Sequence, residues 1–107
     1  MKRIPEKDIE GSRVKGIRGF VELYNIITLP FVAGVRIVSE DSEVPQRVHA
    51  HPEKQIIYVI EGNPMITNRM QTLHLKPGDF IILEPNEKHY IITENNLAKI
   101  FEIKYPE

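Results

Sequence analysis

Apolar and polar residues alternate along most of the chain, in short segments rich in Ile, Val, Phe and Tyr. Side chains on a β-strand alternate between the two faces of a sheet, so this pattern is typical of strands with one buried face. Turn sequences such as EGNP, KPGD and EPNEK separate the segments. We predict strands at 17–28, 33–39, 46–51, 55–61, 64–68, 71–75, 79–84, 89–94 and 97–104.

The number of short strands limits the fold class. Strands of this length must hide their edges, either in a closed barrel or in two sheets wrapped into a jelly roll. A chain of 107 residues is too short for two cores of its own. We therefore predict a single all-β domain over residues 1–107, with residues 1–16 as an N-terminal arm in which PEKDIEGS forms at most a helical turn.

Composition and charge narrow the range of partners. The net charge is −1, and the lysines are scattered without the basic stripe that tracks a phosphate backbone. The apolar run at 26–35 is interrupted by Pro30 and Gly34 and is shorter than the roughly 20 residues that span a bilayer. The charged N-terminal segment lacks the apolar stretch of a secretory signal. We expect a cytoplasmic protein that binds neither nucleic acid nor membrane.

The segment HAHPEKQ at 49–55 carries the first candidate chemistry. His49, His51 and Gln55 stand at even offsets, so their side chains can share one face of the sheet, which Ile57 and Val59 continue. If that face lines the barrel, two imidazoles and an amide oxygen converge in an apolar interior. Buried imidazoles need polar partners, and a metal ion is one such partner. The chain has no cysteine, so nitrogen and oxygen atoms would have to hold the metal.

A second segment, PGDFIILEPNEKHYII, adds another histidine. The strand at 79–83 turns through residues 84–88 and returns with His89. A hairpin of this kind could set His89 beside His49 and His51. Ile91 then follows on the same face as His89.

Together the two segments resemble the two motifs of the cupin superfamily, over residues 34–104. The residues that carry this resemblance are His49, His51, Gln55 and Gly62, followed by Pro77, Gly78, Asp79, Pro85 and His89. The resemblance implies a double-stranded β-helix of the RmlC-like jelly-roll type, a homodimer, and a divalent transition metal in the barrel. Carried over position by position, it implies the metal ligands His49, His51, Gln55 and His89. In some cupins three histidines bind the metal and the fourth residue holds a water molecule, which is an alternative role for Gln55.

Three positions depart from the motifs. Glu43 stands where the first motif has a glycine, so we expect that turn to be built around Asp41 and Ser42. In the second motif Glu84 replaces a proline and Asn86 replaces a glycine. Asn is the non-glycine residue that best tolerates positive φ, so we expect the turn at Asn86 to be preserved.

Gln55 distinguishes this ligand set. Three neutral imidazoles and a neutral amide leave the charge of a divalent ion uncompensated, which favours strong polarisation of a bound oxygen atom. Nitrogen and oxygen ligands suit Ni, Zn, Fe, Mn, Co or Cu, and spacing does not choose among them.

The resemblance favours a metal-dependent enzyme that binds a small oxygenated substrate at the metal. Gln-containing sets of this kind are similar to those of small cupins that act on unsaturated uronate sugars. One alternative is a dioxygenase resembling quercetin dioxygenase, and another is a non-catalytic ligand-binding or sensor cupin. The sequence identifies no general base, because Glu61 and Glu84 lie near strand ends and Tyr58 points away from His49 by alternation.

Four further residues are candidates for a substrate pocket. Arg36 alternates with apolar neighbours and could either face the cavity, where it would pair with a substrate carboxylate, or lie exposed on its strand. Ile57, Val59 and Ile91 would supply the apolar wall. We interpret His74 as an ordinary strand histidine.

Overall fold

The computed structural model describes the backbone of residues 1–49 and 52–106, and the side chains of these residues except 47–49. Every predicted strand segment overlaps an observed strand, although residues 50 and 51 of one predicted strand lie outside the described residues. A short 3₁₀ helix, η1, falls within the segment where a helical turn was expected. The elements are η1 (Glu6–Asp8), β1 (Ser12–Lys15), β2 (Phe20–Ile27), β3 (Val32–Val38), β4 (Glu43–His49), β5 (Lys54–Glu61), β6 (Met65–Thr67), β7 (Thr72–His74), β8 (Phe80–Leu83), β9 (His89–Ile92) and β10 (Ala98–Tyr105).

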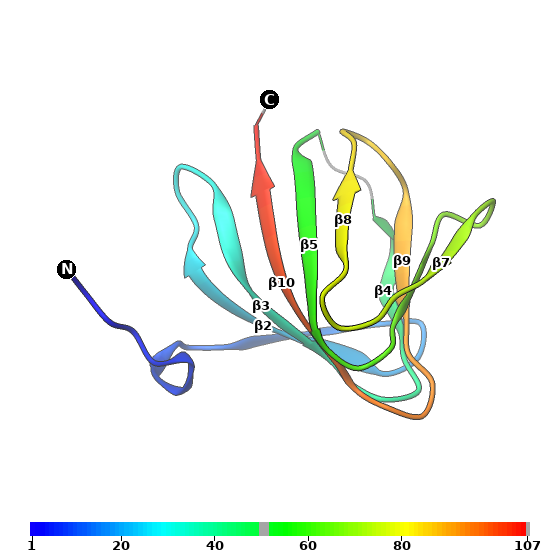
Figure 1. The fold of residues 1–107 in the computed structure, drawn as a ribbon, viewed down its shortest axis with the longest axis horizontal. Coiled ribbons are helices and arrows are strands. Elements are labelled where there is room, and N and C mark those ends of the chain that lie inside the picture. The colour runs from blue at the N-terminus through cyan, green and yellow to red at the C-terminus, as the bar shows by residue number, and fades with distance from the viewer. Residues whose placement is uncertain (50–51, 107) are drawn as a thin grey trace.

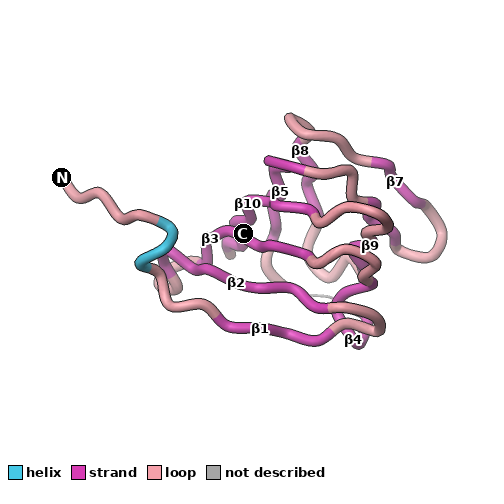
Figure 2. The backbone as a smooth tube through the Cα atoms, turned by 90° about the horizontal axis from the view of Figure 1, so that it is seen from below, coloured by secondary structure: helices cyan, strands magenta, loops and turns pink. Residues whose placement is uncertain are grey.

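The strands form two antiparallel sheets that face each other across an interior (Figure 1). The larger sheet has the order β1-β2-β3-β10-β5-β8, and the smaller has the order β4-β9-β6-β7. The second view shows β1 and β2 along one side and β9 and β7 on another, with η1 between the N-terminal segment and β1 (Figure 2). The prediction of an all-β jelly-roll barrel is confirmed. In the described part of the chain, no helix is long and apolar enough to cross a membrane.

The N-terminal region contains a strand where we expected only an arm. Strand β1 pairs with β2, with Val14 opposite Val21. The hairpin closes through a hydrogen bond from the Gly16 N–H to the Gly19 carbonyl, 3.0 Å long, and Gly19 has a φ of +64°. The segment SRVK has too little apolar character to reveal a strand locally, and pairing with β2 is what extends it.

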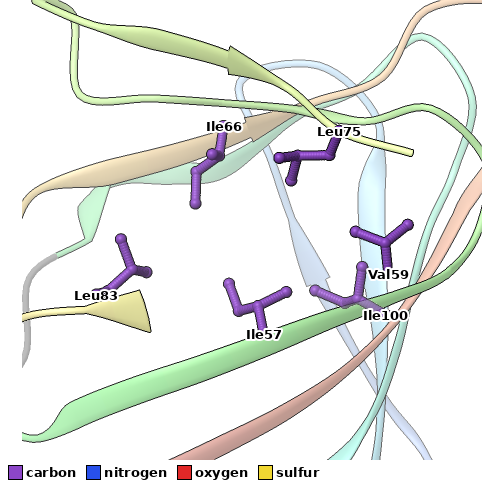
Figure 3. Close-up of a cluster of buried hydrophobic side chains, with 6 residues drawn as sticks. All are labelled: Ile57, Val59, Ile66, Leu75, Leu83 and Ile100. Carbon is purple, nitrogen blue, oxygen red and sulfur yellow. The ribbon is translucent and has the colours of Figure 1, made fainter. Parts of the chain in front are cut away.

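The hydrophobic core follows the alternation seen in the sequence. On β5 the alternate residues Gln55, Ile57 and Val59 are buried. Ile57 and Val59 belong to a cluster contributed by several strands of both sheets (Figure 3). Its members are Ile57, Val59, Ile66, Leu75, Leu83 and Ile100. Each such side chain stabilises the fold by about 1.5–3 kcal/mol, so this cluster fixes which face of β5 lies inside.

The two turns that depart from the cupin motifs adopt the expected conformations. Asp41 has a φ of +49° and Asn86 a φ of +64°. The turn before β4 is held by a hydrogen bond from the Asp41 N–H to the Glu94 carbonyl, 2.7 Å long. Both predictions about these turns are therefore confirmed, and the second turn delivers the chain to His89.

The strand ends place the candidate site at one end of the barrel. The end of β4, the start of β5, the end of β8, the start of β9 and the end of β10 all lie at the same end (Figure 1). Gln55 is paired with Leu83 of β8 on one side and with Lys104 of β10 on the other. We call this end the open end of the barrel.

Candidate functional site

Gln55 is a buried amide with an unsatisfied oxygen. Only 2% of the residue is exposed. Its side-chain Oε1 has no hydrogen-bond partner among the described residues. Leaving a buried acceptor without a partner costs about 1–3 kcal/mol. Among the described residues nothing offsets this cost, and the amide presents an oxygen donor to whatever binds beside it.

His89 is buried in a fixed orientation. It is 4% exposed, and its Nδ1 lies 3.0 Å from the Glu87 carbonyl oxygen. A carbonyl can only accept, so Nδ1 carries the proton and donates this hydrogen bond. The lone pair of the neutral ring is then on Nε2, the arrangement that metal-binding histidines adopt.

The other two predicted ligands cannot be placed in the same detail. Strand β4 pairs with β9 so that His49 stands opposite His89 in the backbone register. The His49 side chain and the whole of His51 lie outside the described residues. Within the part of the chain that is described, no three His, Cys, Asp or Glu residues form a group that could hold a metal. The structure thus brings Gln55 and His89 to the same open end and leaves the four-residue ligand set a prediction.

A cavity of about 200 Å³ lies inside the barrel next to His89. Its walls are largely aliphatic and come from both sheets. Its polar lining residues, besides His89, are Asn25, Arg36, Glu102 and Lys104. Of the predicted pocket residues, Arg36 and Ile91 line this cavity, whereas Ile57 and Val59 lie in the hydrophobic core cluster.

Arg36 and Glu102 form an ion pair in the cavity wall. The Arg36 Nε donates to a Glu102 carboxylate oxygen at 2.7 Å, and the residues are 4% and 7% exposed. Arg36 also donates through Nη1 to the Val35 carbonyl at 3.2 Å. Arg36 is therefore buried, and a carboxylate of the chain itself already partners it. Two buried charges that compensate each other in this way avoid most of the cost of an isolated buried ion.

Sequence reasoning missed Glu102 and Lys104. Both belong to β10, where they share the inner face with Ala98 and Ile100. Alternation could have placed them together, because the four residues are spaced by two. Each face of β10 carries both apolar and charged residues, however, so the pattern did not reveal which face lies inside.

Comparison with known proteins supports the family. A family model described as a cupin domain matches residues 37–103. No curated protein matches the chain in sequence.

Solved structures share the fold at low sequence identity. The polyketide cyclase RemF from Streptomyces resistomycificus is 24% identical, with a TM-score of 0.82 over 100% of this chain and 80% of that one. A predicted oxalate decarboxylase from Thermotoga maritima is 17% identical, with a TM-score of 0.86 over 99% of this chain and 100% of that one. An RmlC-like cupin from Shewanella frigidimarina is 19% identical, with a TM-score of 0.78 over 97% and 89% of the two chains. With its two-sheet barrel and a family match over most of its length, the chain belongs to the cupin family.

Proposed function

We propose that the chain is a metal-dependent enzyme that acts on a small oxygenated molecule in the barrel cavity. In this proposal His49, His51, Gln55 and His89 hold one divalent transition metal. The observation that carries it is the buried Gln55 Oε1, which has no hydrogen-bond partner among the described residues. The Nδ1–H tautomer of His89, fixed by Glu87, fits the same role.

The donor set suits the chemistry of such an ion. Nitrogen and oxygen donors of this kind bind Ni, Zn, Fe, Mn, Co or Cu. Held by neutral ligands, the ion would keep its full charge and polarise an oxygen atom of the substrate. Other cupins often bind a metal ion, and the proposed site of this chain is consistent with that property.

Glu102 is the proposed proton acceptor. It is the one carboxylate among the described residues that line the cavity. Its hydrogen bond from Arg36 holds it in one orientation on the wall. A carboxylate positioned in this way can take a proton from a substrate hydroxyl group beside a polarised oxygen and return it to a substrate carbon. Arg36 acts here as a positioning residue.

Proton transfer of this kind favours an isomerisation, such as the opening of an unsaturated uronate sugar to its linear keto form. Glu102 supports this candidate, because it supplies the base that the ligand set lacks. The largely aliphatic wall favours a second candidate, a dioxygenase resembling quercetin dioxygenase, whose substrate would be more apolar.

We also propose that two copies of the chain form a homodimer through the outer face of β5 and β8. Phe80 is 67% exposed and Ile82 59% exposed on this face, and the Phe80 ring lies 4.6 Å from that of Tyr58. Exposed apolar side chains grouped in this way are typical of an interaction surface.

The test begins with metal content. We expect untagged protein to hold close to one transition metal ion per chain, and His89→Ala to lose it. Metal-containing protein is then assayed on unsaturated uronates and flavonols, with Glu102→Gln as the comparison. Turnover that falls in Glu102→Gln, at unchanged metal content and in a variant that remains folded by circular dichroism, supports the enzyme. A metal-containing protein that binds compounds of the panel and converts none of them points to a sensor and contradicts the proposal.

A further inference from the structure

Among the described residues, the cavity wall carries two cationic side chains, Arg36 and Lys104, and one carboxylate, Glu102. Arg36 and Glu102 neutralise each other through their 2.7 Å contact. Lys104 lines the same cavity, and among the described residues it has no carboxylate partner and no hydrogen bond from its ammonium group. Among the described residues that line the cavity, Lys104 is therefore the cationic side chain without a carboxylate partner.

The strand places this charge beside the candidate metal site. Lys104 pairs with Gln55 of β5 on one side and with Val32 of β3 on the other. Directly paired residues of antiparallel strands have Cβ atoms about 4.5–5.5 Å apart. A ligand group that lies beside the Gln55 amide is thus within reach of the Lys104 ammonium.

The far end of the cavity has the opposite character. It is lined by Val21, Val38 and Val44, and the last two belong to a hydrophobic cluster with Ala98. Ala98 and Lys104 are the inward-facing residues near the two ends of β10. The cavity accordingly runs from a cationic group at the open end to an aliphatic wall toward the other end of the barrel.

We propose that the cavity takes a small carboxylate whose anionic group binds Lys104 and whose apolar body packs against Val21, Val38 and Val44. Arg36 does not serve this purpose, because a ligand that took Arg36 would leave Glu102 buried without its partner. The volume of about 200 Å³ suits a body the size of one ring, since an apolar cavity of about 150 Å³ holds benzene. A lysine is a single point charge, which suits a monoanion better than the several oxygens of a phosphate group.

This inference rests on the part of the proposed function that makes the cavity the ligand site. It requires neither catalysis nor a particular metal. The carboxylate site and the metal-dependent enzyme can therefore fail separately, and the experiment distinguishes these two failures.

The experiment titrates the protein, as purified and after treatment with a chelator, with benzoate by calorimetry. Benzamide is the uncharged probe of the same shape, and phenyl phosphate is the alternative anion. The variants are Lys104→Met, Lys104→Arg to retain the charge, and Lys99→Met as a matched control. Lys99 is on the same strand, but it pairs with Glu6 at 3.1 Å outside the cavity.

We expect benzoate to bind more tightly than benzamide, and Lys104→Met to weaken benzoate about tenfold or more, as the loss of a charged hydrogen bond predicts. Lys104→Arg should retain most of the affinity, and Lys99→Met should match the wild type. The same dependence on Lys104 should persist in the chelated protein.

This inference is overturned if benzoate does not bind, or if benzoate and benzamide bind equally well. It is also overturned if Lys104→Met and Lys99→Met change the benzoate affinity by the same amount. Tighter binding of phenyl phosphate overturns the assignment to a carboxylate. Binding that depends on Lys104 in a protein that holds no metal would sustain the inference and contradict the proposed metal enzyme. A protein that contains metal and does not bind benzoate would contradict this inference and leave the proposed metal enzyme standing.

Discussion

The Arg36 guanidinium and the Glu102 carboxylate meet at 2.7 Å, although 66 positions separate the two residues in the sequence. They lie on the paired strands β3 and β10, where Gly34 stands directly opposite Glu102. Because Gly34 has no side chain, no β3 side chain stands directly opposite the Glu102 side chain. The ion pair ties two strands of the large sheet together on the inner face and determines which charges the cavity presents.

Breaking this pair should destabilise the fold. Removal of one partner leaves an uncompensated buried charge, so Arg36→Met should lower the free energy of unfolding by about 3–5 kcal/mol. The double variant Arg36→Met with Glu102→Leu should lose much less, because it buries no charge. Urea denaturation of the single and double variants measures both values.

Arg13→Met is the control for the ion pair. Arg13 lies 3.7 Å from Glu22 on the surface, and an exposed pair contributes about 0–1 kcal/mol. If Arg36→Met cost no more than Arg13→Met, the Arg36–Glu102 contact would have no structural importance.

Glu102→Gln should increase the affinity for benzoate. The substitution keeps the shape of the side chain and removes its charge, so Arg36 would join Lys104 as a cationic side chain without a carboxylate partner among the described residues that line the cavity. Calorimetric titration of the variant with benzoate and benzamide checks this, and only the benzoate affinity should rise. An unchanged or weaker affinity for benzoate would mean that Arg36 does not influence the ligand.

Gln55→Leu should raise the stability of the metal-free protein and weaken its metal binding. The substitution removes a buried oxygen that has no partner among the described residues, so the metal-free protein should become more stable by about 1 kcal/mol. It should also lose most of the stabilisation that a bound metal gives, which is about 2.7 kcal/mol at a concentration of 100 times Kd. Melting temperatures with and without added Ni or Zn test both effects.

The control is Gln46→Leu, because Gln46 is an exposed residue of β4. It should change neither the metal-free stability nor the response to metal by more than a small amount. A Gln55→Leu protein with wild-type metal stabilisation would remove Gln55 from the ligand set and favour the three-histidine alternative.

Charged residues on the outer face of β8 should prevent dimerisation. We expect the wild type to sediment as a dimer and the variant Phe80→Lys with Ile82→Lys as a folded monomer, because two lysines would repel their symmetry mates. Leu29→Lys, at a residue that is 82% exposed outside this face, should leave the dimer intact. A monomeric wild type would contradict the proposed interface.

The turn before His89 should depend on the residue at position 86. Asn86 has a φ of +64°, and a β-branched residue there should cost about 1–2 kcal/mol. Asn86→Val is therefore expected to destabilise the protein by that amount, and Asn86→Gly to be neutral or slightly stabilising. Urea denaturation compares the two, and equal stabilities would show that the backbone relaxes out of positive φ.

Features that depend on local geometry can be predicted from the sequence alone. The period of two along β5 placed Gln55, Ile57 and Val59 on one face, and their burial agrees with it. The positive φ of Asn86 followed from the conformational preference of asparagine. Such features need only neighbouring residues, so a single sequence contains them.

The side chains that line the cavity depend on how distant strands pair in the folded barrel. Strand β1 forms because β2 offers it a partner, and Arg36 finds Glu102 because β3 and β10 are neighbours in the sheet. Both faces of β10 mix apolar and charged residues in sequence, so the burial of Glu102 and the inward position of Lys104 depend on which face of the sheet lines the barrel. Pairing between distant strands sets that face, and local alternation cannot specify it.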